Sequence, residues 1–121
     1  MAGIAEIWIL DAELVAPEVP DLVGYEVSAR DGNVGKVEEV VIGDDGREYI
    51  VVDTGFWILG KKRMIPAGAI DTIDPKNKRI NVRMKKSDIK SAPDYDRATR
   101  NDDDVRRSHE DHYKPFSRLR R

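Results

Sequence analysis

The sequence contains no cysteine and no long apolar run. Without cysteine the chain forms neither disulfides nor thiolate metal sites, and it has no cysteine nucleophile. Its apolar runs are far shorter than the roughly 20 residues that a membrane-spanning helix needs, so we expect no transmembrane segment. The first ten residues include Glu6 and lack the basic start of a signal peptide. We therefore expect a cytoplasmic protein.

Histidine is scarce as well. His109 and His112 are the only two imidazoles, and both lie in a charged C-terminal segment. Spaced three apart, they could share one face of a helix, but no third ligand stands at a suitable spacing for a metal. We expect them to lie on a solvated face.

The sequence offers little for catalysis. No histidine is available as a base for the serines of the region that we expect to pack. The neighbouring Glu38 and Glu39 should point to opposite faces of a strand and so could not act together. An acidic pair contributed by two separate strands is the alternative that the sequence leaves open. We predict a protein that is not an enzyme, with no catalytic residue, metal or cofactor.

Charge is distributed unevenly along the 121 residues. Residues 1–60 carry thirteen Asp/Glu and three Lys/Arg, a net charge of −10, whereas residues 61–90 carry ten Lys/Arg and three Asp, a net charge of +7. A basic patch in the second segment could contact RNA or anionic lipid; its members would be Lys61, Lys62, Arg63, Lys76, Lys78 and Arg79. Because the whole chain carries only −2, we favour the alternative that oppositely charged strands pair across a sheet.

Short β-strands separated by turns dominate residues 20–93. The turn signals recur every 8–12 residues, as is typical of an all-β barrel or sandwich. Residues 1–19 end in PEVP, whose prolines interrupt regular structure, and should form an arm or a short helix. Residues 94–121 have few aliphatic side chains. We expect a weakly docked tail there, either disordered or helical around residues 103–113.

The stretch DGNVGK at residues 31–36 raises the question of a phosphate-binding loop. Such a loop needs a glycine six residues before its lysine, where this chain has Arg30, and a hydroxyl directly after the lysine, where it has Val37. A strand follows in place of the required helix. The stretch is better explained as a hairpin turn followed by a glycine that lets the next strand bend.

The order of motifs across residues 20–93 resembles the PRC-barrel domain, which is named for the cytoplasmic part of the photosynthetic reaction centre H subunit. The resemblance rests on LVGYEVSARDGNVGKVEEVVIG, then EYIVVDTGFWILGKKRMIPAGAID, then KRINVRMKKSDIKSAP. Small stand-alone bacterial members of the family are the most similar. The matching turn residues are Gly24, Asp31, Gly32, Gly35, Gly55, Gly60 and Pro66.

The resemblance implies a small β-barrel of about five or six strands that acts as a non-catalytic adaptor and often self-associates. We predict a homodimer, because large aromatic side chains outside so small a core would be costly unless a partner covered them. The predicted interface anchors are Trp8, Tyr25, Phe56, Trp57 and Ile58. A second, unidentified protein partner is also expected. The alternative is an RNA- or ribosome-associated module that uses the basic segment.

Overall fold

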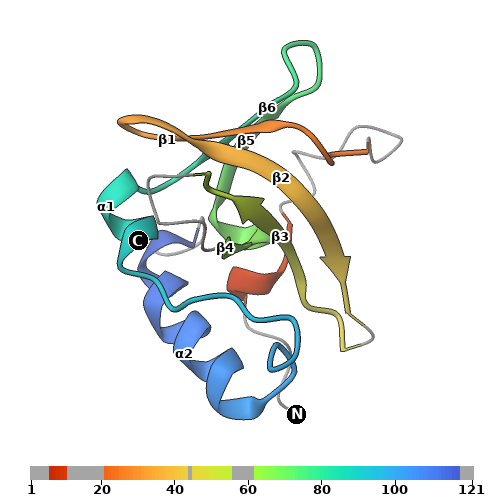
Figure 1. Cartoon of the computed structure of the whole chain (residues 1–121), viewed down its shortest axis with the longest axis vertical. Helices are drawn as coiled ribbons and strands as arrows, with labels where there is room; N and C mark the ends of the chain where they lie inside the picture. The colour runs from red at the N-terminus through yellow and green to blue at the C-terminus, as the bar shows by residue number, and fades with distance from the viewer. Residues whose placement is uncertain (1–5, 11–20, 44, 56–61, 118–121) are drawn as a thin grey trace.

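A computed structural model of the chain describes residues 6–10, 21–43, 45–55 and 62–117 (Figure 1). Within these ranges the elements, in chain order, are η1 (Glu6–Trp8), β1 (Glu26–Ala29), β2 (Gly32–Ile42), β3 (Glu48–Asp53), β4 (Lys62–Pro66), η3 (Ala67–Ala69), β5 (Ile70–Asp74), β6 (Arg79–Val82), α1 (Lys86–Lys90), α2 (Asp103–Tyr113) and η4 (Lys114–Phe116). The described part of the chain is therefore mostly β, with one longer helix near its C-terminal end.

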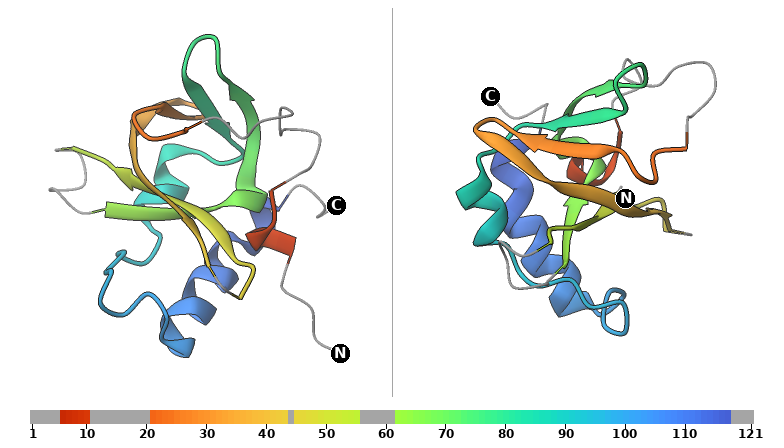
Figure 2. Two further views of the ribbon diagram at one scale, coloured as in Figure 1. Left: turned by 90° about the vertical axis from the view of Figure 1, so that its right-hand side faces the viewer. Right: turned by 45° about the horizontal axis from the view of Figure 1, so that its top comes forward.

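The six strands form one curved sheet in the order β4-β3-β2-β1-β6-β5. Neighbouring strands are antiparallel except β1 and β6, which are parallel. The predicted number of strands is confirmed, but the sheet is not closed, because β4 and β5 do not pair within the described residues. The short helix η3 connects these two strands, so the sheet curls toward a barrel without completing it (Figure 2).

Gly35 determines how β2 bends. Its φ angle is +154°, and a Cβ atom at this position would lie 2.0 Å from the carbonyl oxygen of Asp53. The pairing of β1 with β2 shifts register here, since Val27 lies opposite Gly35 whereas Ser28 lies opposite Asn33. Only glycine permits both this backbone angle and this close approach. The glycine predicted to bend the strand therefore also lets β2 approach the end of β3.

The middle of β3 is buried on both faces. Tyr49, Ile50, Val51 and Val52 are each at most 4% exposed, although successive side chains of a strand point in opposite directions. One of these faces packs against the N- and C-terminal segments, since Tyr49 contacts the rings of Trp8 and Tyr95 edge-on. A sheet in which only one face is covered would not bury these four residues, so the terminal segments are part of the core.

The C-terminal segment is docked firmly, contrary to the predicted weakly docked tail. The helix predicted around residues 103–113 is α2, and it buries His109 and Tyr113 completely against the rest of the chain (Figure 1). The indole N–H of Trp8 donates to Glu110 at 2.6 Å, and His112 Nε2 lies 2.6 Å from the Asp88 carbonyl. The predicted solvated histidine face is therefore wrong for His109. The sequence did not indicate that His109 is buried, because charged residues surround it in the chain.

No helix of the described ranges is long and apolar enough to cross a membrane.

Candidate functional site

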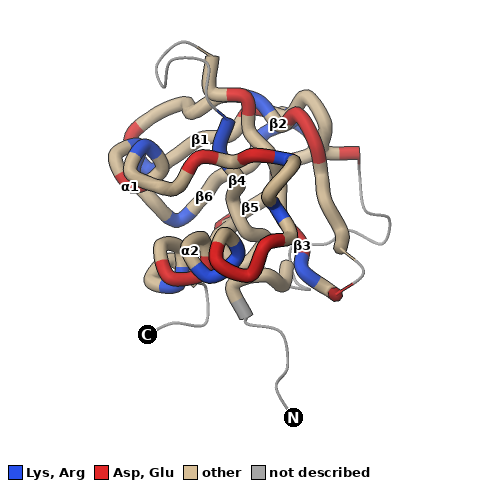
Figure 3. Tube along the Cα trace, turned by 60° about the horizontal axis from the view of Figure 1, so that its bottom comes forward, with Lys and Arg blue, Asp and Glu red and all other residues tan. Residues whose placement is uncertain are grey.

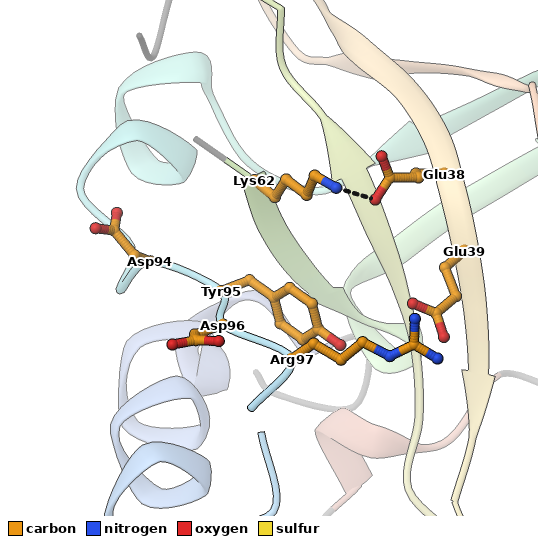
Figure 4. Close-up of a pocket in the computed structure, with 7 residues that line it drawn as sticks. All are labelled: Glu38, Glu39, Lys62, Asp94, Tyr95, Asp96 and Arg97. Carbon is orange, nitrogen blue, oxygen red and sulfur yellow. Dashed lines mark hydrogen bonds and ion pairs between the residues drawn. The ribbon is translucent and has the colours of Figure 1, made fainter. Parts of the chain in front are cut away.

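A shallow, open depression of about 480 Å³ lies where β2, the start of β4 and the segment after α1 meet (Figure 4). Its lining is strongly charged, with four carboxylates, two cations and one phenol: Glu38, Glu39, Asp94, Asp96, Lys62, Arg97 and Tyr95. These residues come from β2, from the start of β4 and from the segment after α1, which lie side by side in the fold. We treat this depression as the candidate site because it gathers more ionisable side chains than a flat surface would.

Glu38 and Glu39 both line this depression, although they are neighbours in one strand. The expectation that they point to opposite faces fails because the pairing of β2 with β3 shifts register between Val37 and Glu39. A bulge inserts one residue and breaks the alternation of side chains. The bulge thus brings two carboxylates to the same place, which strand periodicity alone does not predict.

Three of the four carboxylates of the depression, those of Glu38, Glu39 and Asp94, form ion pairs. Lys62 Nζ lies 2.6 Å from Glu38 Oε2, and this hydrogen bond raises the pKa of the lysine (Figure 4). Arg100 Nη1 lies 3.4 Å from Glu39 Oε2. Charged side chains of both signs therefore lie together at this surface, an arrangement suited to electrostatic recognition.

Arg63 connects the depression to the interior. Its guanidinium is 4% exposed and donates to the carbonyls of Ile89 and Lys90 at the end of α1, each at 2.9 Å. It also forms an ion pair with Asp94 at 2.6 Å. The planar fork of an arginine can satisfy several acceptors at once. Arg63 therefore fastens the start of the C-terminal segment to β4.

Tyr49 and Tyr95 extend the site into the core. Their ring centroids are 6.1 Å apart, and Arg100 donates to the Tyr95 hydroxyl at 3.2 Å. Burial, followed by the hydrogen bond with Tyr95, raises the pKa of Tyr49 to about 12. The Tyr49 phenol is therefore a packed hydrogen-bonding group that stays neutral at neutral pH.

The described residues offer no metal centre. Within the ranges that the structure covers, no three or more His, Asp or Glu side chains converge on a point where a metal ion could bind. His109 Nδ1 and His112 Nε2 lie near the backbone carbonyls of Val105 and Asp88 instead.

A family model for the PRC-barrel domain matches residues 18–89 of this chain, which is more than half of its length. The chain belongs to the PRC-barrel domain family. This assignment agrees with the resemblance in the sequence and with the curved six-stranded sheet, and the family is a non-catalytic fold family. A search of the curated proteins finds no match to the chain.

The predicted interface anchors of this PRC-barrel protein fall into two groups. Trp8 is 0% exposed and Tyr25 is 6% exposed, so both rings belong to the core and neither is presented to a partner. Trp8 is held there by its bond to Glu110 and by Arg47, whose guanidinium lies 5.3 Å above the indole. The other anchors, Phe56, Trp57 and Ile58, lie outside the described residues, and their role stays a prediction.

The basic residues of this protein do not gather into one patch among the described ones. Arg63 is buried, and Lys62 pairs with Glu38. Lys76 and Lys78 lie in the turn between β5 and β6, which projects from the sheet (Figure 1), and Arg79 lies 3.7 Å from Glu26. In the sheet order, β3, β2 and β1 separate β4 from β6. Lys61 lies outside the described residues.

Opposite charges instead stand beside one another across the sheet. Lys62 lies opposite Asp53, which lies opposite Lys36 on its other side, and Arg79 lies opposite Glu26. The mixture of acidic and basic segments is visible along the backbone in Figure 3. This pattern agrees with the favoured interpretation of the uneven charge.

The predicted turn residues occupy bends of the chain wherever they are described. Four of the predicted glycines have positive φ angles, namely Gly24, Gly32, Gly35 and Gly55. Asp31 accepts a hydrogen bond from the backbone N–H of Lys86, and Pro66 ends β4. Gly60 lies outside the described residues.

Sequence reasoning missed the exposed aliphatic side chains of β2. Val40 is 37% exposed and Ile42 is 67% exposed, although both stand in a strongly apolar stretch. Their alternate spacing in VEEVVIG was a usable signal, because it places them on one face. Val40 and Ile42 stay exposed because the described segments do not cover them. The sequence alone does not show this.

Proposed function

We propose that this PRC-barrel protein is a non-catalytic adaptor that binds other proteins and pairs with a second copy of itself. The observation that carries the proposal is the exposed aliphatic pair Val40 and Ile42 on β2. Uncovered side chains of this kind favour association, because burying them against a partner removes apolar area from water. Membership of a non-catalytic fold family and the paired carboxylates of the depression support a binding role.

The surroundings of Ile42 add to this apolar surface. Ile42 lies opposite Glu48 in the register, and Glu48 accepts a hydrogen bond from the backbone N–H of Leu10 at 3.3 Å. Ile9, the neighbour of Leu10, is 45% exposed. Exposed aliphatic side chains at this end of the sheet suit a two-fold contact, in which the same patch meets itself.

A pair of charge substitutions tests this proposal. Ile42→Glu places a carboxylate in the proposed contact and should weaken self-association at least about tenfold, as expected when a central interface residue is changed. Val23→Glu is the matched control, because Val23 is 52% exposed but lies outside β2. Light scattering at micromolar concentration reports the mass. Equal effects of the two substitutions would contradict the proposed surface, as would a monomeric wild-type protein.

RNA binding is the weaker alternative, because the described basic residues are dispersed and several are paired. Retention of RNA should be absent at low salt if the protein is a protein-binding module. Strong binding at low salt that weakens steeply with added salt would instead indicate phosphate contacts.

A further inference from the structure

The contact between α2 and the rest of the chain contains a buried imidazole. His109 is 1% exposed and Tyr113, one turn later, is 0% exposed. Their rings stack with centroids 6.4 Å apart. These are the two buried residues of an otherwise polar helix, so they form its contact with the fold. We propose that α2 is a pH-sensitive strap that detaches from the sheet when His109 takes up a proton.

The hydrogen bonding of His109 suits only the neutral ring. Nδ1 lies 2.9 Å from the carbonyl of Val105, which can only accept, so Nδ1 carries the proton. In the neutral ring Nε2 then bears a lone pair, and this buried atom has no hydrogen-bond partner among the residues that the structure describes. Protonation would place a positive charge on this buried ring, where the backbone carbonyls of Val105 and Pro93 are the acceptors that favour it and burial opposes it.

The groups that face His109 add to this cost. Arg63 approaches from β4 with a permanent positive charge, and His112 and Tyr113 belong to α2 itself. The Tyr113 hydroxyl also lacks a hydrogen-bond partner within the described ranges, and burial raises its pKa, so it stays neutral. The carbonyl of Pro93 is the one acceptor that faces the ring from the segment after α1, without the geometry of a hydrogen bond to Nε2.

Burial, with smaller contributions from His112 and Arg63, therefore lowers the pKa of His109 below its usual value, even though the Val105 carbonyl favours the charged ring. A detached α2 would expose the ring to water, where histidine titrates at about pH 6.5. The equilibrium constant for docking of α2 should then be largest above about pH 6.5. It should fall as the pH drops below this value, by up to about tenfold per pH unit. Carboxylic side chains ordinarily titrate at about pH 4 and do not supply proton uptake in this range.

Among the described residues, the side chains of α2 make two hydrogen bonds to the rest of the chain, those of Glu110 to Trp8 and of His112 to Asp88. Detachment would break these bonds and remove Tyr113 from the core. The strands keep their own backbone ladders. Detachment would uncover the Trp8 indole.

Hydrogen exchange followed by mass spectrometry on the full chain tests the proposal. We expect the protection of residues 103–113 to fall about tenfold between about pH 7.5 and pH 5.5, after correction for the intrinsic exchange rate, and that of β3 to change much less. In His109→Gln the protection of α2 should be independent of pH, because the amide does not titrate. His112→Gln removes the bond to the Asp88 carbonyl and should lower the protection of α2 at both pH values, but the fall between them should remain as in the wild type.

Three outcomes would overturn the proposal: α2 protection that is the same at both pH values, an equal fall in His109→Gln, or an equal fall in β3. Should His109→Gln fail to fold, the NMR titration of the wild-type imidazole decides instead. An apparent pKa of His109 clearly below that of a free histidine supports the strap, and a value at or above about 6.5 overturns it.

Discussion

At the scale of single residues, two glycines show how the backbone constrains the fold. Gly35 and Gly55 both have positive φ angles, but they differ in their surroundings. A Cβ atom at Gly35 would meet the Asp53 carbonyl oxygen at 2.0 Å, whereas one at Gly55 would meet nothing within 4 Å. The two positions therefore separate the cost of backbone strain from the cost of a steric clash.

Gly55→Ala should lower the free energy of unfolding by about 1 kcal/mol, which is the strain of a left-handed residue. Gly35→Ala should cost more than about 3 kcal/mol, because β2 and β3 would have to move apart as well. Urea denaturation of both variants measures the difference. Equal losses would show that the close approach of Gly35 to β3 is not a constraint on the fold.

The adjacent residues Arg63 and Lys62 show how differently two members of one basic run can act. Arg63 is buried and binds two backbone carbonyls and a carboxylate, whereas Lys62 forms an ion pair at the surface. Sequence reasoning placed both in a basic patch, because the pattern KKR does not show which lysine or arginine faces inward. Which of the two side chains faces inward is set by the alternation along β4, and the phase of this alternation depends on the residue at which the strand begins.

At the scale of elements, Arg63 attaches α1 and the segment after it to β4. Arg63→Met should lower the free energy of unfolding by about 3 kcal/mol, because it leaves the Ile89 and Lys90 carbonyls and Asp94 without this partner. Lys62→Met is the control and should cost less than about 1 kcal/mol, as is usual for an exposed ion pair. Thermal or urea unfolding measures both. A loss in Lys62→Met as large as that in Arg63→Met would contradict this role of Arg63.

Much of the element order follows from local sequence, and the rest does not. Turn glycines and apolar alternation predict the strands, and the helix around residues 103–113 follows from a run of residues that tolerate helix. The docking of α2 does not follow, because His109 and Tyr113 are its only buried residues and stand among charges. The bulge beside Glu38 is likewise set by pairing with β3, which no local pattern encodes.

At the scale of the whole molecule, the domain and its C-terminal segment behave as one packed unit. The family match ends at residue 89, yet the core continues through Ala92 and Tyr113. The predicted boundary at residues 93–94 was drawn from composition. It falls between the domain and a C-terminal segment whose side chains complete the core. The aliphatic pair on β2 is exposed on this unit and is the surface that we propose for a partner.

The most direct test of the account is the mass of the full chain in solution. Sedimentation equilibrium at micromolar concentration, at low and at moderate salt, should give twice the chain mass of 13.7 kDa in both conditions. The insensitivity to salt follows because apolar burial, which salt does not screen, drives the contact. A mass of a single chain at both salt concentrations would contradict self-association as the function of this PRC-barrel protein.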